Sequence, residues 1–258
     1  MTATVFAQKP SKNLFFIDGK VGLALCEWLV SEFKQDLGLV VTNSAGPIQE
    51  CAAAAGVPYI TRSAESDTIA AIERLGLNFD FGFLIWWPKI ISREVMQIPK
   101  KGFINTHPSY LPYNRGKHYN FWALVEEAPF GVSLHFVEEG VDSGDIVAQT
   151  AIDYGWEDTG KTLYESAQHA MIELFKSSYP LLRIGRYTRL AQDLSRGSFH
   201  LARELEPASQ IGLDKTYTAR ELLNLLRART FPGYPACWFE DDSGDIYEAR
   251  IEIRRKQQ

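Results

Sequence analysis

An amide, an imidazole and a carboxylate in the middle of the chain have the chemistry and the spacing of a group-transfer site. Asn105 and His107 stand at the end of an apolar run, and Asp142 stands in a tight turn about 35 residues later. If both segments are strand ends of one α/β core, they converge at one edge of its sheet. We then expect Asn105 to donate a hydrogen bond to a developing oxyanion, His107 to accept a proton and Asp142 to orient and charge the imidazole. Such a site uses neither a metal ion nor a side-chain nucleophile.

Each of these residues also has an ordinary structural explanation. Asn105 can form a turn, His107 before a proline can be a loop residue, and Asp142 can be a turn carboxylate. The remaining histidines show no comparable set of partners in the sequence, although the first of them shares the loop after His107 and can reach a substrate: His118, His135, His169 and His200.

A second motif points to a different class of function. Residues 155–162 match the G-x-x-x-x-G-K-[ST] pattern of a nucleotide-binding loop, between an expected strand and an expected helix. Glu157 and Asp158 bring two negative charges into the loop, where they would repel a phosphate, and Trp156 is bulky. The competing interpretation is a helix start that Thr162 caps. An NTP-dependent kinase therefore stays an alternative to group transfer.

The elements that must position these residues alternate between strands and helices. Helical spacing predicts helices at 21–30, 47–55 and 68–75, and apolar, β-branched segments predict strands at 13–17, 37–42, 57–60, 80–87 and 102–105. This alternation predicts an α/β fold with a mostly parallel, twisted, Rossmann-like sheet flanked by helices.

The second half of the chain has a more mixed pattern. We expect a polar loop at 106–117, a long helix at 162–182 with Thr162 and Glu165 as its capping box, and no regular element over 184–214. Strands at 131–137 and 146–152 are antiparallel because their connection is short. The other expected elements are helices at 119–127 and 218–229 and a terminal hairpin of 236–240 and 246–253. The chain then divides into a catalytic domain, 1–183, and a small C-terminal helix and β-hairpin region, 184–258.

Composition narrows the classes of function. The 258 residues are 45% hydrophobic and 23% charged, as in an ordinary globular protein, and a net charge of −5 without a basic cluster disfavours nucleic-acid binding. Cys26, Cys51 and Cys237 have no spacing typical of zinc sites or disulfides. No apolar run is long enough to span a membrane and the first residues lack a secretory signal, so we expect a cytoplasmic protein.

The stretch around the candidate catalytic residues resembles a known family. The run NTHPSYLPYNRG, followed by FWALVEEAPFGVSLHFVEEGVDSGDIVAQ, resembles the formyltransferases that use 10-formyltetrahydrofolate. The resemblance covers most of residues 13–183, and the family's catalytic Asn, His and Asp fall on Asn105, His107 and Asp142. It implies that an amine attacks the formyl carbon and that tetrahydrofolate leaves. Asn105 and protonated His107 would stabilise the oxyanion, and Asp142 would support the imidazole and the proton transfers.

The resemblance also implies where the folate binds. In this family the pterin lies against the backbone after the fourth strand and against the segment before the catalytic Asp. Alternation along 80–87 buries one of two adjacent tryptophans in the core. The expected folate contacts are Trp86, Trp87, Lys89 and Ile90 from the first segment and Val137, Gly140 and Val141 from the second. No metal ion is implied.

The C-terminal third distinguishes the branches of the family. Residues 213–223 and 227–234 resemble the tail of sugar-nucleotide N-formyltransferases, and LPYNRGKHYNFW resembles the same branch, with Tyr119 in place of its proline. This implies that the acceptor is a dTDP- or GDP-linked 4-amino-4,6-dideoxyhexose, or its 3-amino isomer, made for O-antigen or another surface polysaccharide. The alternatives are glycinamide ribonucleotide or another amine as acceptor, and a non-catalytic sugar-nucleotide or folate binder.

The sugar-nucleotide branch implies a set of substrate contacts. For Arg227 and Arg229, a solvated helix end is the competing interpretation. The terminal hairpin offers an edge strand that can pair in a homodimer. The candidate contacts to hexose, phosphates and base are Ser109, Tyr110, Asn114, Arg115, His118, Arg227, Arg229, Phe231 and Tyr234.

Overall fold

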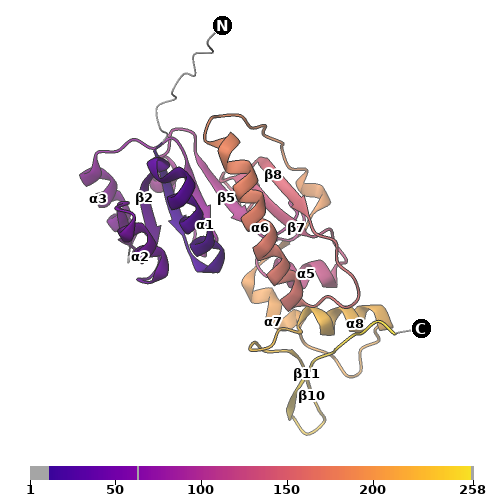
Figure 1. Cartoon of the computed structure of the whole chain (residues 1–258). Helices are drawn as coiled ribbons and strands as arrows, with labels where there is room; N and C mark the ends of the chain where they lie inside the picture. Colours follow the sequence, from indigo (N-terminus) through magenta and orange to yellow (C-terminus); the bar gives the residue numbers. More distant parts are fainter. Residues whose placement is uncertain (1–11, 63, 257–258) are drawn as a thin grey trace. The chain divides into compact units, whose positions relative to one another are not determined.

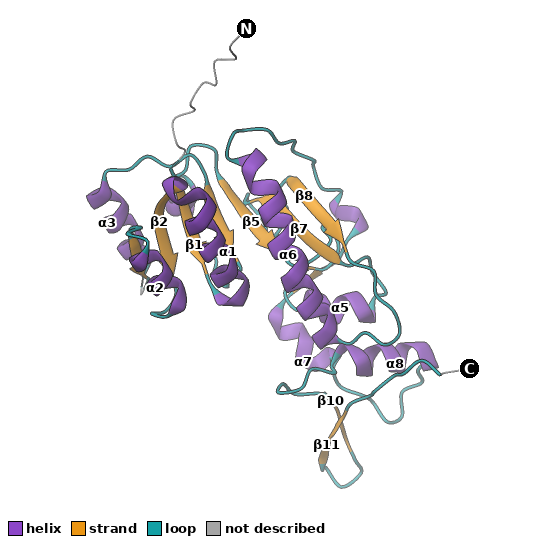
Figure 2. Ribbon diagram, viewed as in Figure 1, coloured by secondary structure: helices purple, strands orange, loops and turns teal. Residues whose placement is uncertain are grey.

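The computed structural model describes residues 12–62 and 64–256, which form two compact units. Within the described residues, the first unit contains 12–106 and 175–188, and the second contains 107–174 and 189–256. Figure 1 labels many of the elements of each unit, and Figure 2 distinguishes helices, strands and loops. The predicted domain boundary between residues 183 and 184 stays a prediction.

Parallel strands form the sheet of the first unit. β1, β2 and β4 are buried along their whole length, which matches their mostly apolar sequences, because a parallel sheet is covered on both faces. In spatial order the strands are β3 (Tyr59–Thr61), β2 (Leu37–Thr42), β1 (Asn13–Ile17), β4 (Gly82–Ile85) and β5 (Phe103–His107). The predicted parallel arrangement is confirmed.

Local signals set the starts of the helices between these strands. The Asp18 carboxylate accepts a hydrogen bond from the Gly19 N–H at 2.8 Å, and Pro47 occupies the first turn of the next helix. The helices are α1 (Gly19–Phe33), α2 (Pro47–Ala54), α3 (Glu65–Leu75) and the short α4 (Arg93–Met96), and a 3₁₀ turn, η1 (Lys34–Asp36), joins α1 to β2.

Aromatic side chains fill the core of the first unit. Phe15 and Phe83 stack with ring centroids 5.1 Å apart, and Tyr179, near the end of α6 (Gly160–Leu182), packs against both rings. The Tyr179 hydroxyl donates to the buried Asp36 carboxylate at 3.0 Å, and Arg183 forms an ion pair with the same carboxylate at 2.5 Å. These contacts tie the last turns of α6 to the start of β2.

The second unit contains an antiparallel strand pair, β7 (Gly131–Phe136) and β8 (Ile146–Ala151), as predicted. Its α5 (Tyr119–Val125) packs against α8 (Ala219–Ala228). The start of α6 differs from the prediction. The helix begins at Gly160, where the Thr159 N–H donates to the Thr162 hydroxyl at 2.9 Å. The predicted capping box of Thr162 and Glu165 is wrong, because Thr162 already lies inside the helix.

Short elements occupy regions that the sequence predicts to be irregular. β6 (Arg115–Gly116) lies in the expected loop and pairs in parallel with β9 (Phe199–His200). Only glycine fits at position 116, because its φ is +90° and a Cβ there would lie 2.2 Å from the His200 carbonyl oxygen. The remaining elements of this segment are η2 (Leu194–Arg196), η3 (Ala202–Glu204) and α7 (Leu205–Ala208).

The C-terminal helix and hairpin agree with the sequence prediction. Thr218 and Glu221 form a capping box at the start of α8, and β10 (Cys237–Glu240) pairs antiparallel with β11 (Ile246–Ala249). The prediction of an α/β fold with a mostly parallel sheet, flanking helices and a small C-terminal appendage is confirmed. Within the described part of the chain, no helix combines the length and the apolar character needed to cross a membrane.

Candidate active site

His107 is the last residue of β5, and Asn105 precedes it by two positions. Because side chains alternate along a strand, Asn105 and His107 leave one face of β5 and Thr106 leaves the other. The Thr106 hydroxyl accepts a hydrogen bond from the Trp86 N–H at 2.9 Å and donates to the Leu84 carbonyl at 3.1 Å. Thr106 therefore fixes the carboxyl end of β5 beside the carboxyl end of β4.

Asp142 faces His107 at ion-pair distance. Its Oδ2 lies 3.4 Å from Nδ1 of His107 and accepts a hydrogen bond from the Gly116 N–H at 3.0 Å. Asp142 has a φ of +50°, a backbone conformation that is uncommon outside functional sites and tight turns. The Gln192 amide supports the turn by donating to the carbonyls of Asp142 and Gly144 at 2.9 and 2.6 Å. The structure thus brings together the imidazole and the carboxylate that the sequence singles out.

Asp142 is an ionised carboxylate although it is largely buried. Burial by itself raises the pKa of Asp142, but the imidazoles of His107 and His135 and the Gly116 N–H act in the opposite direction. Together they hold the pKa of Asp142 well below its usual range. Asp142 therefore keeps its negative charge at neutral pH and can stabilise a positive charge on a neighbouring ring.

His135 is a third member of this cluster, and the expectation that it has no comparable partners is wrong. Its Nε2 lies 3.6 Å from Oδ1 of Asp142, and its side chain is 2% exposed. Its Nδ1 lies 2.8 Å from the Phe136 carbonyl oxygen, which can only accept a hydrogen bond. The sequence signal that could have identified His135 is a histidine within an apolar strand, seven residues before Asp142.

The buried position of His107 favours its neutral form. Burial lowers the pKa of His107 below its ordinary value, and the Asp142 carboxylate acts against this effect. The other ring nitrogen, Nε2, is buried and makes no hydrogen bond of good geometry within the described residues. A neutral ring that directs Nδ1 to Asp142 leaves Nε2 available to accept a proton.

The same cluster contains donor atoms of the kind that bind transition metals. One atom from each of His107, His135 and Asp142 lies within 4.8 Å of the other two. Two imidazoles and a carboxylate suit zinc or a similar ion. The ion pairs of Asp142 already give these three residues a structural reason to lie together, and the sequence expectation of no metal stays a prediction.

The loop after β5 carries several of the expected substrate contacts. Asn114 is buried and its amide donates to Glu126 at 2.9 Å, while Arg115 lies over the Phe199 ring at 5.8 Å. Burial and the charges of Arg229 and Lys117 lower the pKa of His118. Arg115, Lys117 and Arg229 bring positive charge to this part of the second unit. Of the other expected contacts in this loop, Ser109 is buried and Tyr110 is half-buried.

The C-terminal arginines are buried, so the interpretation of a solvated helix end is wrong. Arg227 donates to the Gly155 carbonyl at 2.5 Å and to the Asn224 side chain at 2.9 Å. Arg229 pairs with Glu206 at 3.0 Å. Contacts of these arginines with a diphosphate stay predictions. The same holds for a base contact of Phe231 and Tyr234, whose rings lie 4.8 Å apart.

The loop at 155–162 does not form a phosphate cradle. The Asp158 carboxylate accepts hydrogen bonds from the Gly155 N–H at 2.7 Å and from the Thr162 hydroxyl at 2.9 Å. Lys161 pairs with Glu165 on the helix surface at 3.1 Å. A phosphate site needs such donors directed at an anion. The geometry therefore disfavours the kinase alternative.

The two predicted folate segments belong to different units. In the first unit, Trp87 is buried and packs edge-on against Phe16 at 5.1 Å, whereas Trp86 is half-buried with a φ of +53°. This confirms that one tryptophan enters the core. Lys89 and Ile90 are exposed. In the second unit, Gly140 and Val141 are exposed and Val137 is half-buried. Their contacts with folate stay predictions.

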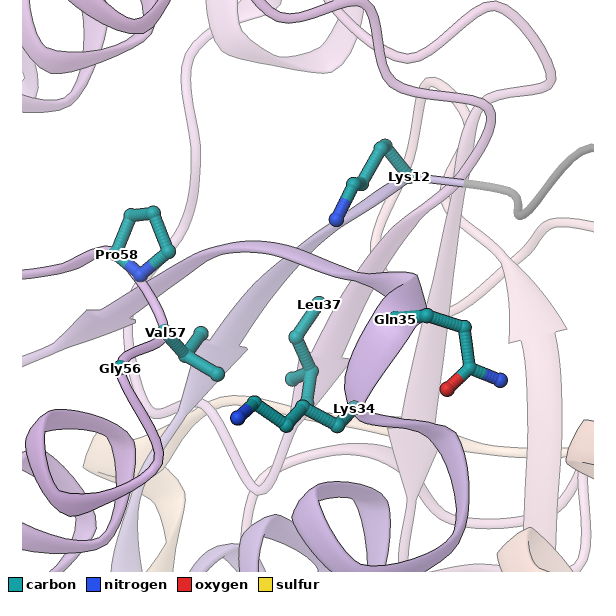
Figure 3. Close-up of a pocket in the computed structure, with 7 residues that line it drawn as sticks. All are labelled: Lys12, Lys34, Gln35, Leu37, Gly56, Val57 and Pro58. Carbon is teal, nitrogen blue, oxygen red and sulfur yellow. The ribbon is translucent and has the colours of Figure 1, made fainter.

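A shallow pocket lies beside the amino ends of strands β1, β2 and β3 in the first unit (Figure 3). Its lining residues precede or begin β1, β2 and β3, whereas His107 ends β5. The pocket is therefore at the amino ends of parallel strands, and α/β sheets bind their ligands at the carboxyl ends. The lining residues are Lys12, Lys34, Gln35, Leu37, Gly56, Val57 and Pro58.

Solved structures share the fold over most of the chain. A 4-N formyltransferase from Francisella tularensis is 22% identical, with a TM-score of 0.78 over 95% of this chain and 99% of its own. The formyltransferase PseJ from Anoxybacillus kamchatkensis is 26% identical, with a TM-score of 0.56 over 76% of this chain and 89% of its own. A glycinamide ribonucleotide transformylase from Symbiobacterium toebii is 20% identical, with a TM-score of 0.61 over 71% of this chain and 95% of its own.

Two family models match separate parts of the sequence. The model of an N-formyltransferase dimerization C-terminal domain matches residues 204–255. The formyl transferase model matches residues 21–177, which include Asn105, His107, His135 and Asp142. Because this match spans more than half of the protein, the chain belongs to the formyl transferase family.

Proposed function

We propose that this formyl transferase moves a formyl group from 10-formyltetrahydrofolate to the amino group of a nucleotide-linked amino-deoxyhexose. The choice of acceptor depends on how much of this chain each known protein or family model matches. The family match at 204–255 lies within the C-terminal third and the Francisella tularensis 4-N formyltransferase aligns with 95% of the chain, whereas the glycinamide ribonucleotide enzyme aligns with 71%. Glycinamide ribonucleotide is therefore the second candidate acceptor.

The residues of the candidate site suit the proton transfers of this reaction. A formyl-bearing folate supplies an activated one-carbon group. Asp142 holds Nδ1 of His107, so that Nε2 accepts the proton that the attacking amine must lose. The imidazolium that forms is then stabilised by Asp142. Asn105, on the same face of β5 as His107, donates to the charge that develops on the formyl oxygen.

The second unit also suits an anionic acceptor. Arg115, Lys117 and Arg229 contribute positive charge around the loop after β5. A diphosphate requires such donors, and arginine binds phosphates in a bidentate manner. PseJ was solved in complex with UDP-4,6-dideoxy-4-formamido-L-AltNAc and tetrahydrofolate, so uracil joins thymine and guanine among the bases to be tested.

The proposal also includes the oligomeric state of the protein and its place in the cell. The match to a dimerization domain at 204–255 supports a homodimer formed through the C-terminal region. We further propose that the protein works in the cytoplasm and that its product enters the synthesis of a surface polysaccharide such as O-antigen.

The test is an absorbance assay for tetrahydrofolate formation from 10-formyltetrahydrofolate. Acceptors are dTDP-, GDP- and UDP-linked 3-amino- and 4-amino-deoxyhexoses, with glycinamide ribonucleotide as the competing acceptor. We expect turnover with one sugar nucleotide and its loss in Asn105→Ala, His107→Ala and Asp142→Ala. Turnover with glycinamide ribonucleotide alone would replace the proposed acceptor. Folate or sugar-nucleotide binding without turnover would favour a non-catalytic binder.

A further inference from the structure

The pairing of β6 with β9 reaches the catalytic carboxylate. The Arg115 N–H donates to the Ser198 carbonyl at 3.1 Å, and the Lys117 N–H donates to the His200 carbonyl at 3.0 Å. Between these two bonds, the Gly116 N–H donates to Asp142 Oδ2 at 3.0 Å. β9 therefore sets the position of the N–H group that holds Asp142.

His200 anchors β9 through both ring nitrogens and through its ring face. Its Nε2 lies 2.8 Å from Oε1 of Glu126, and its Nδ1 lies 3.1 Å from Oε2 of Glu204. The imidazole stacks on Trp122 with ring centroids 3.8 Å apart and planes within 7°. The expectation that His200 has no comparable partners is wrong, because carboxylates on two sides and an indole below fix this ring.

Glu126 links His200 to the loop that carries Gly116. While its Oε1 faces His200, its Oε2 accepts hydrogen bonds from the Ser198 hydroxyl at 2.7 Å and from the Asn114 amide at 2.9 Å. Asn114 is 1% exposed and lies two residues before Gly116. One carboxylate thus holds β9 on one side and the start of β6 on the other.

We propose that His200 is a positioning residue for formyl transfer. By clamping β9 on Glu126, Glu204 and Trp122, it keeps the Gly116 N–H on Asp142 and thereby keeps Asp142 directed toward His107. His200 acts through these groups and not on the reacting atoms. The proposal rests on the proposed function, because it assigns a kinetic consequence to the clamp.

The kinetic test uses His200→Phe, which keeps an aromatic ring on Trp122 and removes both bonds to carboxylates. We expect kcat to fall about tenfold while both KM values change less than about twofold, because small misplacements of catalytic groups have effects of this size or larger. His200→Gln, whose amide can still donate to Glu126, recovers part of the rate. The matched control is His169→Gln, an exposed histidine of α6, which keeps the wild-type rate.

The second readout does not depend on turnover. In protein labelled with ¹⁵N-histidine, the ring resonances of His107 move in His200→Phe and stay in place in His169→Gln, because the contact with Asp142 changes only in the former. If His200→Phe does not fold in a thermal-unfolding assay, Ser198→Ala, which removes one bond to Glu126, takes its place, with a loss of about threefold expected.

Two results would overturn the proposal. One is a wild-type kcat in His200→Phe, and the other is a lowered kcat with unmoved His107 resonances, which would make the role of His200 structural only. Absence of formyl transfer by the wild-type protein would instead count against the proposed function. In that case the resonances of His107 still show whether the clamp positions Asp142.

Discussion

Each unit of the protein buries a carboxylate, and the two clusters are built differently. Asp36, in the first unit, accepts a hydrogen bond from the Tyr179 hydroxyl at 3.0 Å and two from Arg183 at 2.5 and 2.8 Å. Asp142, in the second unit, faces His107 and His135 at 3.4 and 3.6 Å.

The difference lies in what the partners can do with a proton. The hydrogen bond to Asp36 raises the pKa of Arg183 still further, so this guanidinium stays charged at any physiological pH. An imidazole gains or loses a proton close to neutral pH, and His107 keeps a buried nitrogen that lacks a well-formed bond within the described residues. The ion pair of Asp36 and Arg183, whose cation keeps its proton, thus supports the fold. The pair of Asp142 and His107 contains an imidazole that can take up and release a proton, so it can do chemistry.

Breaking the second cluster should give the largest effect. We expect Asp142→Asn to lower kcat/KM about 10³-fold or more, because a neutral amide neither fixes the His107 tautomer nor stabilises the imidazolium. The measurement is the tetrahydrofolate assay on variant and wild type with matched thermal unfolding. Asp242→Asn, an exposed carboxylate of the hairpin turn, serves as the control. Near-wild-type activity of Asp142→Asn would remove Asp142 from the mechanism.

Breaking the first cluster should affect stability and spare the chemistry. Asp36→Asn leaves Arg183 without its ion-pair partner, and we expect the free energy of unfolding to fall by about 3 kcal/mol. Urea unfolding measures this loss, and kcat per folded molecule should remain within about twofold of the wild-type value. Asp80→Asn, in an exposed pair with Lys101, should cost far less. A strong loss of kcat in Asp36→Asn would contradict the contrast between the clusters.

The pH dependence of kcat/KM tests whether His107 acts as a base. A base works when neutral, so kcat/KM should be retained above the pKa of His107 and should fall as the pH drops through it. Since burial lowers this pKa, the acidic limb should lie below pH 6.5, the ordinary value for histidine. In Asp142→Asn the limb should move further toward acid, because the carboxylate favours the charged ring. A fall of kcat/KM as the pH rises through the pKa of His107, in place of the acidic limb, would show that His107 acts as a protonated group.

Removing His135 should have a smaller effect than removing Asp142. His135→Phe deletes one partner of the carboxylate and leaves the contact with His107 in place. Because His135 helps to keep the pKa of Asp142 low, we expect a loss of about tenfold in kcat. His135→Gln, whose amide can still donate to Asp142, should be closer to the wild type. Equal activity of all three proteins would mean that His135 only packs.

The smallest effect concerns the loop at 155–162. Lys161→Ala removes a surface pair with Glu165, so we expect less than about 1 kcal/mol in stability and no measurable change in kcat. The comparison with Asp142→Ala in the same assay distinguishes the two classes of enzyme. Loss of activity in Lys161→Ala with activity retained in Asp142→Ala would revive the kinase alternative.

Local patterns in the sequence were enough for the longer regular elements and for choosing His107 and Asp142 as candidate site residues. The bounds of β1 and β2 agree with the prediction because each is a mostly apolar run between polar segments. The His107–Asp142 pair was predictable because the motif around each residue is compact. The antiparallel β7 and β8 followed from their short connection.

Only the tertiary structure decided the contacts between segments that are far apart in the sequence. β6 and β9 are two residues long, too short to show a period, and they meet across more than 80 residues of chain. His135 and His200 look ordinary in the sequence because their partners, Asp142 for the former and Glu126 and Trp122 for the latter, are set by packing. For Arg227 the sequence leaves a solvated helix end as one of two interpretations, and the structure buries this side chain against Gly155. The sequence determined which residues can exchange a proton, and the fold decided which neighbours hold them, because hydrogen bonds and ion pairs depend on distances that periodicity does not encode.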